Sequence, residues 1–286
     1  SAGIERGIRE KLQESGVELQ IVRMDSKRRS SESEKRRAAW RAKEAIETFN
    51  PDVVIASDDN ASKYLVAPYL KDTDLPVVFC GVNWDASVYG FPARNVTGMV
   101  EVALIDALNV HLKRYTKGSR VGYLSGKAFT AQKIASHYND HYYAGRMKLY
   151  LVKDFAGFKE AFLRAQDEVD MLFINNYVGI GDWNPEAAKQ FLVEHVRIPT
   201  VSQSVFMAPF VLLALAKDPQ EQGEWAASTA LEILGGRTPS EIPLAYNERA
   251  LLFANLKMAD ALGITFPLKT LEAATVIGQE SFAVKP

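Results

Sequence analysis

Polar side chains that could hold a small ligand follow two neighbouring apolar segments in the first third of the sequence. PDVVIA at 51–56 is followed by the polar run at 57–60, and PVVFC at 76–80 is followed by Asn83 and Trp84. Short Val- and Ile-rich runs are typical of strands that are buried on both faces of a parallel sheet. In such sheets, ligands bind beyond the carboxyl ends of the strands. We therefore expect a ligand crevice at these two strand ends.

A second set of polar and aromatic residues follows strand candidates in the middle of the chain. A carboxylate can pair with an ammonium group, N–H groups at a helix start can hold a carboxylate, and aromatic faces can enclose an apolar side chain. This inventory suits a zwitterionic small molecule such as an amino acid. A cap or turn role is the alternative for each residue taken alone. The predicted ligand-binding residues are Asp59, Asn60, Ala61, Asn83, Trp84, Ser125, Gly126, Lys127, Phe129, Asn176, Tyr177 and Gln203.

Other reactive side chains have simpler explanations. Asp58 and Asp59 resemble a magnesium-binding acidic pair, but one of them is expected to cap the following helix and the other to face a ligand. His137 and His141 are four residues apart and lack a third metal ligand. Cys80 has no base nearby in the sequence and is expected to be a small buried residue. We therefore predict no metal site.

Nucleotide-binding and hydrolase motifs are incomplete in this sequence. Gly126 and Lys127 are followed by Ala128 instead of Ser or Thr, and Gly179 and Gly181 lack the third glycine of a dinucleotide fingerprint. No G-x-S-x-G motif surrounds a serine. These absences favour a binding protein over an enzyme, with no catalytic residue and no cofactor.

Size and charge narrow the class of protein further. A chain of 286 residues with 47% hydrophobic content can form two cores, and a formal net charge of -1 gives no general attraction to nucleic acid or anionic membrane. Residues 27–43 contain eight Lys or Arg and two Glu. These charges fall on the outer face of a predicted amphipathic helix without a DNA-reading motif, so no nucleic-acid partner is expected.

The predicted elements alternate between strands and helices in two successive sets. A helix over 3–15 precedes a strand over 17–24, and Ser31 with Glu34 forms a capping box that opens the next helix. After a helix near 102–115 the alternation restarts, which predicts an α/β fold with two Rossmann-like, doubly wound lobes. The predicted lobes are 1–103 plus 206–240, and 104–205 plus 241–286.

Two motifs resemble one known family. FCGVN at 79–83 followed by RNVTGMVE at 94–101, and the tail at 221–267 with its N-L-K-x-A-x-x-L-G-I-x-x-P pattern, are similar to the ABC-transporter substrate-binding family of type I periplasmic solute-binding proteins. The resemblance spans nearly the whole chain. It implies two lobes joined by a hinge, closure over a small polar or amino-acid-like ligand, and delivery to an ABC permease.

The resemblance also implies a location and a partner. A member would act as a monomer in the periplasm or outside the cell, with or without a membrane anchor. Members begin with a strand and a loop before the first helix, whereas this sequence starts at the helix, so a central strand and part of the site are expected to precede Ser1. The alternative is a ligand-sensing input domain of a signalling protein with the same fold; a repressor effector domain is less well supported, because no helix-turn-helix accompanies it.

Overall fold

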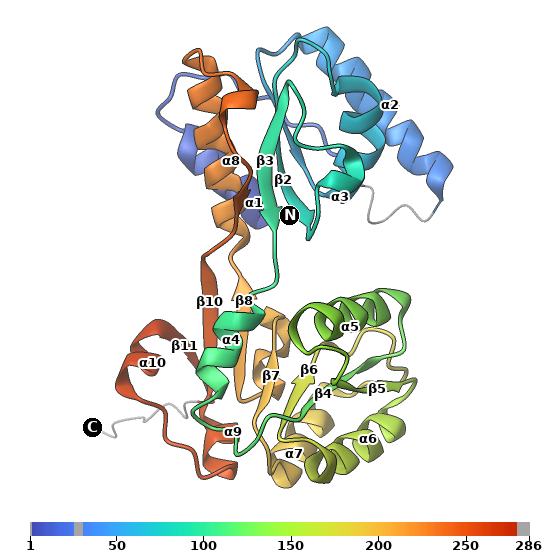
Figure 1. Ribbon diagram of the computed structural model, residues 1–286, viewed down its shortest axis with the longest axis vertical. Coiled ribbons are helices and arrows are strands. Elements are labelled where there is room, and N and C mark those ends of the chain that lie inside the picture. Colours follow the sequence, from blue (N-terminus) through green and yellow to red (C-terminus); the bar gives the residue numbers. More distant parts are fainter. Residues whose placement is uncertain (1, 26–30, 279–286) are drawn as a thin grey trace, which may run out of the picture. The chain divides into compact units, whose positions relative to one another are not determined.

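The computed structural model describes residues 2–25 and 31–278 and divides into two compact α/β units. The first unit comprises Ser1–Ala103 and Asp218–Arg249, and the second comprises Leu104–Lys217 and Ala250–Pro286. The chain therefore passes between the units three times, after Ala103, after Lys217 and after Arg249. Figure 1 shows the helices and strands of each unit.

The first unit is built on a parallel sheet with the strand order β1-β2-β3-β9. Its strands are β1 (Val54–Ser57), β2 (Val77–Asn83), β3 (Val96–Glu101) and β9 (Ala245–Tyr246). The side chains of β2 are buried along the strand until Asn83, which is exposed. The strand is therefore covered on both faces, as its Val-rich sequence predicts.

Helices cover this sheet on its two faces (Figure 1). Val78 and Cys80 of β2 pack in one cluster with α1 (Ala2–Leu12) and α8 (Pro219–Leu234). The alternate residue Phe79 packs in another cluster, which draws on α2 and on the helical segment after β1. Because successive strand side chains point to opposite faces, the two clusters lie on opposite sides of the sheet. The helices on the second side are α2 (Glu32–Phe49), α3 (Asp59–Ala61) and its π-helical continuation Ser62–Leu70, with a short 3-10 turn, Ser87–Tyr89, nearby in the sequence.

Two glycines allow α1 and α8 to approach closely. A Cβ atom on Gly7 would lie 2.3 Å from the Gln220 carbonyl oxygen, and one on Gly223 would lie 2.1 Å from the Ile4 carbonyl oxygen. No side chain fits at such distances from backbone atoms, so the helix crossing requires glycine at both positions.

The second unit has a seven-stranded sheet with the order β11-β10-β8-β7-β6-β4-β5. Among the described strand pairs of this sheet, only β10 and β8 are antiparallel. The winding direction changes at β4, which has β5 on one side and β6 on the other. The strands are β4 (Val121–Gly126), β5 (Lys148–Val152), β6 (Met171–Ile174), β7 (Thr200–Ser202), β8 (Leu213–Lys217), β10 (Ala250–Asn255) and β11 (Ala274–Ile277).

The helices of the second unit connect these strands. Asp154 caps α6 and Asn184 caps α7, each by accepting a hydrogen bond from a backbone N–H in the first turn. The helices are α4 (Ile105–Leu112), α5 (Phe129–Tyr142), α6 (Phe155–Glu168), α7 (Pro185–His195), α9 (Leu256–Ala261) and α10 (Leu268–Ala273), with 3-10 turns at Val205–Phe210 and, in the first unit, at Pro239–Glu241.

The structure confirms the predicted capping box and contradicts one predicted strand. The Ser31 hydroxyl accepts the Glu34 N–H, and the Glu34 carboxylate accepts the Ser31 N–H. Residues 17–24, in contrast, form no strand. Leu19 is 37% exposed and Val22 is 45% exposed. An apolar β-prone sequence becomes a strand only when another strand pairs with it, and within the described residues none does here.

Two boundaries between the units differ from the predicted ones. Residues 206–217 belong to the second unit, because β8 pairs with β7 and β10. Residues 241–249 belong to the first unit, because β9 pairs with β3. In both places, sheet pairing between residues far apart in the sequence decides the assignment.

The α1 and α8 contact yields a test of the fold. Replacing a helical Gly by Ala usually stabilises a helix by about 0.8 kcal/mol. At Gly223 the added methyl group would collide with the Ile4 carbonyl, so we expect Gly223→Ala to lower the free energy of unfolding by roughly 1–3 kcal/mol. Urea unfolding measures this change. Ser228→Ala, on the same helix, should change it by less than about 0.5 kcal/mol; an equal effect of both substitutions would contradict the close contact.

Candidate functional site

The carboxyl end of β4 is the point in the second unit where the winding direction of the strand connections changes. Ligands of open α/β sheets bind at such a point. Ser125 and Gly126 end this strand, and the exposed Lys127 follows, with its backbone N–H bound to the Val152 carbonyl at 2.7 Å. A Cβ on Gly126 would lie 2.3 Å from the Val178 carbonyl oxygen. Glycine therefore lets the loop after β6 pass directly over the end of β4.

A hydrogen-bonded network joins the ends of β4, β6 and β7. The Asn175 amide donates to the Ser125 hydroxyl at 3.2 Å, and the Ser202 hydroxyl donates to the Asn175 carbonyl at 3.2 Å. The Tyr138 hydroxyl of α5 donates to Gln203 Oε1 at 2.6 Å. Burial raises the pKa of Tyr138, so its phenol remains a proton donor. These contacts fix the three strand ends relative to one another.

The Gln203 side chain has one group left over in this network. Its Nε2 atom is buried and has no hydrogen-bond partner among the described residues. Buried amide donors are nearly always paired in folded proteins. Gln203 is therefore a donor that a bound molecule could satisfy.

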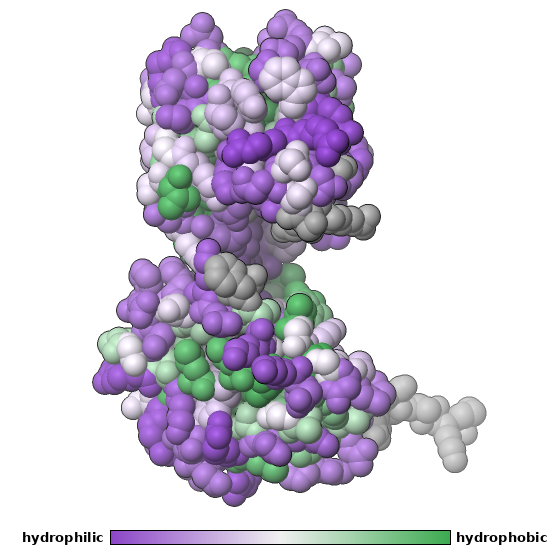
Figure 2. Space-filling view, turned by 90° about the vertical axis from the view of Figure 1, so that its right-hand side faces the viewer, coloured by the Kyte–Doolittle hydropathy of each residue, from purple (hydrophilic) through white to green (hydrophobic). Residues whose placement is uncertain are grey.

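Aromatic rings lie beside the polar network. The Tyr177 and Trp183 rings are stacked, with centroids 5.1 Å apart, and Phe206 meets the Tyr177 ring edge-on at 5.5 Å. Phe210 packs against Trp183 at 5.5 Å. Phe206 is 48% exposed, and its neighbour Val205 is 47% exposed. Figure 2 shows one side of the second unit, on which apolar residues reach the surface at several places. Tyr177 and Phe206 thus offer apolar contact area next to hydrogen-bonding groups.

In the first unit, Asp59 is held by the last residue of β2 and by a residue of the 3-10 turn that follows it. Asn83 Nδ2 donates to Asp59 Oδ2 at 2.7 Å, and the Tyr89 hydroxyl donates to Asp59 Oδ1 at 2.9 Å. Burial and the hydrogen bond to Asp59 raise the pKa of Tyr89. The neighbouring Asp58, with a φ of 90°, is the cap, and its carboxylate accepts the Asn60 N–H. The Asp59 carboxylate is therefore oriented, and it keeps lone pairs for a cationic group.

The remaining predicted site residues have varied environments. Ala61 is buried, Asn60 is half-buried, and Trp84 has a left-handed backbone whose N–H binds the Glu101 carbonyl. The Asn176 side chain accepts the Val178 N–H and so shapes the loop. Phe129 begins α5, and its side chain lies outside the described part of the chain.

The structure thus groups Asp59 with Asn83 in the first unit and collects Ser125, Gly126, Tyr177 and Gln203 near one sheet edge in the second. Sequence reasoning missed four neighbours. Tyr89, Trp183 and Phe206 could have been found as aromatic residues that follow a strand. Nothing in the sequence marks Tyr138, which lies in the middle of a helix. The missed residues are Tyr89, Tyr138, Trp183 and Phe206.

The other reactive side chains considered in the sequence have the following environments. Cys80 is fully buried, and burial raises the pKa of its thiol to about 12. His137 and His141 have ring centroids 4.2 Å apart on α5. Within residues 2–25 and 31–278, no cluster of three or more His, Cys, Asp or Glu side chains could hold a metal ion.

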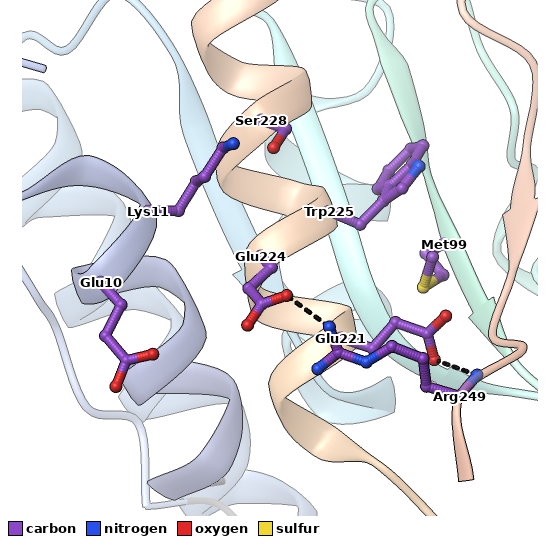
Figure 3. Close-up of a pocket in the computed structure, with 8 residues that line it drawn as sticks. All are labelled: Glu10, Lys11, Met99, Glu221, Glu224, Trp225, Ser228 and Arg249. Carbon is purple, nitrogen blue, oxygen red and sulfur yellow. Dashed lines mark hydrogen bonds and ion pairs between the residues drawn. The ribbon is translucent and has the colours of Figure 1, made fainter.

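A shallow groove of about 510 Å³ lies on the first unit along α8 (Figure 3). Its acidic side chains already have partners: Glu221 accepts two backbone N–H groups, Glu224 binds Arg249, and Glu10 accepts the Gln220 amide. These carboxylates are used within the unit, so the groove is a weaker candidate for ligand capture than the strand ends.

Comparisons with solved structures identify the fold. A substrate-binding protein with adhesive properties from Clostridium difficile, in a ligand-free open form, matches with a TM-score of 0.72 and 14% identity over 98% of this chain and 95% of that chain. An ABC domain from Streptococcus pneumonia in complex with L-Trp matches with a TM-score of 0.59 and 18% identity over 96% and 95%. A LacI-family transcriptional regulator from Silicibacter pomeroyi matches with a TM-score of 0.52 and 13% identity over 88% and 75%.

These likenesses confirm the predicted type I periplasmic-binding-protein fold. The identities, at 18% or below, support the fold alone. No family model and no curated protein sequence matches the chain. Among the described helices, none has both the length and the apolar character required to cross a membrane.

The close approach at Gly126 gives a test of the second-unit site. We expect Gly126→Ala to displace the loop that carries Asn176 and Tyr177, because the methyl group would collide with the Val178 carbonyl. Hydrogen exchange over residues 175–181 should then accelerate. Gly181→Ala is a matched control, since its Cβ would meet only the Lys153 carbonyl, at an ordinary 3.6 Å. Unchanged exchange in the Gly126 variant would contradict the proposed packing.

Proposed function

We propose that this protein is an extracytoplasmic solute-binding protein that captures a small polar or amino-acid-like molecule between its two lobes and delivers it to an ABC permease. The observation that carries the proposal is the set of polar and aromatic side chains at the carboxyl ends of parallel strands in both units. In this fold class such ends are the place where small molecules bind. The solved structures that share the fold include substrate-binding proteins.

The chemistry of the two strand-end clusters favours an amino-acid-like ligand. The oriented Asp59 carboxylate is a partner for an ammonium group, and the spare Gln203 amide is a donor for a carboxylate or carbonyl oxygen. Tyr177 and Phe206 provide aromatic surface for an apolar side chain. One solved structure of the same fold is a complex with L-Trp, which supports this class of ligand.

A binding role requires no catalytic group at these clusters. The Cys80 thiol is buried and protonated, and the Asp59 carboxylate is engaged by Asn83 and Tyr89. We accordingly propose that the ligand is released unchanged, that no cofactor is used, and that the protein acts as a monomer in the periplasm or outside the cell.

The second candidate function is a ligand-sensing domain of a larger signalling or regulatory protein. The likeness to a LacI-family regulator supports it, because that protein shares the fold. A sensor would bind the same class of ligand without delivering it. Ligand-dependent stimulation of a reconstituted permease's ATPase would support transport, whereas ligand binding without such stimulation would support sensing.

The ligand itself can be identified by native mass spectrometry of the purified protein. We expect a stoichiometric small molecule that is lost on unfolding and returns intact on refolding. Calorimetry with the same compound would then measure its affinity. A chemically altered compound after incubation would contradict the binding-protein proposal.

The first-unit cluster predicts a loss of affinity in Asp59→Asn. Removing the negative charge should weaken binding of an ammonium-bearing ligand by roughly 1.5–3 kcal/mol, the value of a charge-assisted hydrogen bond. Asp74→Asn is the control, because the Asp74 side chain is 99% exposed in the same unit. Equal affinities of the two variants would remove Asp59 from the site.

The second-unit rings predict a different pattern in Phe206→Ala. The affinity for ligands with a large apolar side chain should fall by about 1 kcal/mol or more, whereas the affinity for small polar analogues should change little. Leu268→Ala, at an apolar residue that is 71% exposed in the same unit, is the control. A uniform loss for all ligands would argue against an apolar subsite at Phe206.

A further inference from the structure

All three segments at which the chain passes between the units end beside one another on the first unit. The first segment leaves the first unit at Ala103, the second enters it at Asp218, just before α8, and the third leaves it at Arg249. The Asp218 N–H donates to the Arg249 carbonyl at 3.3 Å, so the second and third segments run side by side. Two side chains then tie these segments together.

Arg249 makes the first of these ties. Its Nε donates to Asp218 Oδ2 at 3.0 Å, its Nη2 also contacts Asp218, and its Nη1 donates to Glu224 Oε2 at 2.6 Å. The Glu221 carboxylate accepts the backbone N–H groups of Glu248 and Arg249 at 3.0 and 2.9 Å. Figure 3 shows both contacts with α8: the Arg249 guanidinium donates to Glu224, and the Arg249 backbone N–H donates to Glu221. A planar guanidinium bound at several atoms holds its partners in a fixed geometry.

Asn247 makes the second tie. Its Oδ1 accepts the Val102 N–H at 2.6 Å, and its Nδ2 donates to the Val102 carbonyl at 3.3 Å. The β3 and β9 ladder ends just before, with Val100 opposite Tyr246. The Asn247 side-chain amide therefore bonds the backbone N–H and carbonyl of Val102, as a paired strand would, just beyond the last residue of β9. Asn247 is 3% exposed, so these bonds are shielded from water.

We propose that Asn247 and Arg249 form a clamp that makes the three crossing segments one rigid border of the first unit. Bending between the units is then confined to the few peptide groups just beyond the clamp, next to Leu104, Lys217 and Ala250. The clamp narrows the range of arrangements that the two units sample.

The test compares the range of motion with and without the clamp, in the full chain and in the absence of ligand. Spin labels at Arg37→Cys on α2 and Glu160→Cys on α6 place one probe on an exposed helix position in each unit. Cys80 is fully buried and remains unlabelled. Double electron–electron resonance then gives the distribution of distances between the labels.

We expect Arg249→Ala to broaden this distribution and to accelerate amide exchange at Asp218, Glu248 and Arg249 by about tenfold or more, as the charge-assisted bonds are lost. Arg249→Lys should give an intermediate result, because an ammonium group cannot bridge both carboxylates as a guanidinium does. Asn247→Ala should accelerate exchange at Val102. If Asn247→Ala does not fold, the Arg249 variants still decide, because Arg249 is 46% exposed.

Arg120→Ala is the matched control. Arg120 also binds a carboxylate at two atoms, with Nε and Nη2 at 3.1 and 2.9 Å from Asp170, but it lies in the second unit away from the crossings. An unchanged distance distribution in Arg249→Ala, or an equal broadening in Arg120→Ala, would overturn the clamp. Neither readout requires a ligand, so the result is independent of whether the proposed transport function holds.

Discussion

Burial of the central parallel strands on both faces is the constraint on which both units depend. The side chains of β2 are buried until Asn83, and those of β4 are buried throughout. Helices must therefore cover each face, and polar side chains can reach solvent only where the strands end. For this reason the polar side chains proposed for ligand binding lie at the carboxyl ends of strands in each unit, although the two sheets differ in strand number and order.

The two strand-end clusters proposed as ligand-binding groups are organised in different ways. In the first unit, the Asp59 carboxylate is oriented by donors of two residues, Asn83 and Tyr89. In the second, Gly126 lets the loop after β6 cross the end of β4, and the Gln203 amide keeps a donor without a partner among the described residues. Pre-oriented groups lose little conformational entropy on binding, which accords with the small ligand proposed for this protein.

Glu221 and Glu224 of α8 make contacts of another kind. The Glu224 carboxylate binds Arg249, and the Glu221 carboxylate accepts backbone N–H groups where the chain leaves the first unit. The same helix approaches α1 through Gly223. The helix α8 therefore contacts both the core of the first unit and the segments where the chain leaves it. A shift of α8 would change the contacts at both.

The sequence alone determined those features that depend on neighbours in the chain. The buried character of β2 and the capping box at Ser31 are local patterns, and both were correctly predicted. The resemblance to type I solute-binding proteins fixed the fold class. Local signals could not show whether residues 17–24 would find a strand to pair with, nor that β9 would join β3 and β10 would join β8.

Tertiary structure decided the contacts between residues that are distant in sequence. Tyr89 reaches Asp59 across 30 positions, Tyr138 reaches Gln203 across 65, and Asn247 reaches Val102 across 145. A hydrogen bond of this kind leaves no periodic or composition signal, because either residue could equally face water. Only the pairing order of the strands, set by the burial of their side chains, brings such residues within bonding distance.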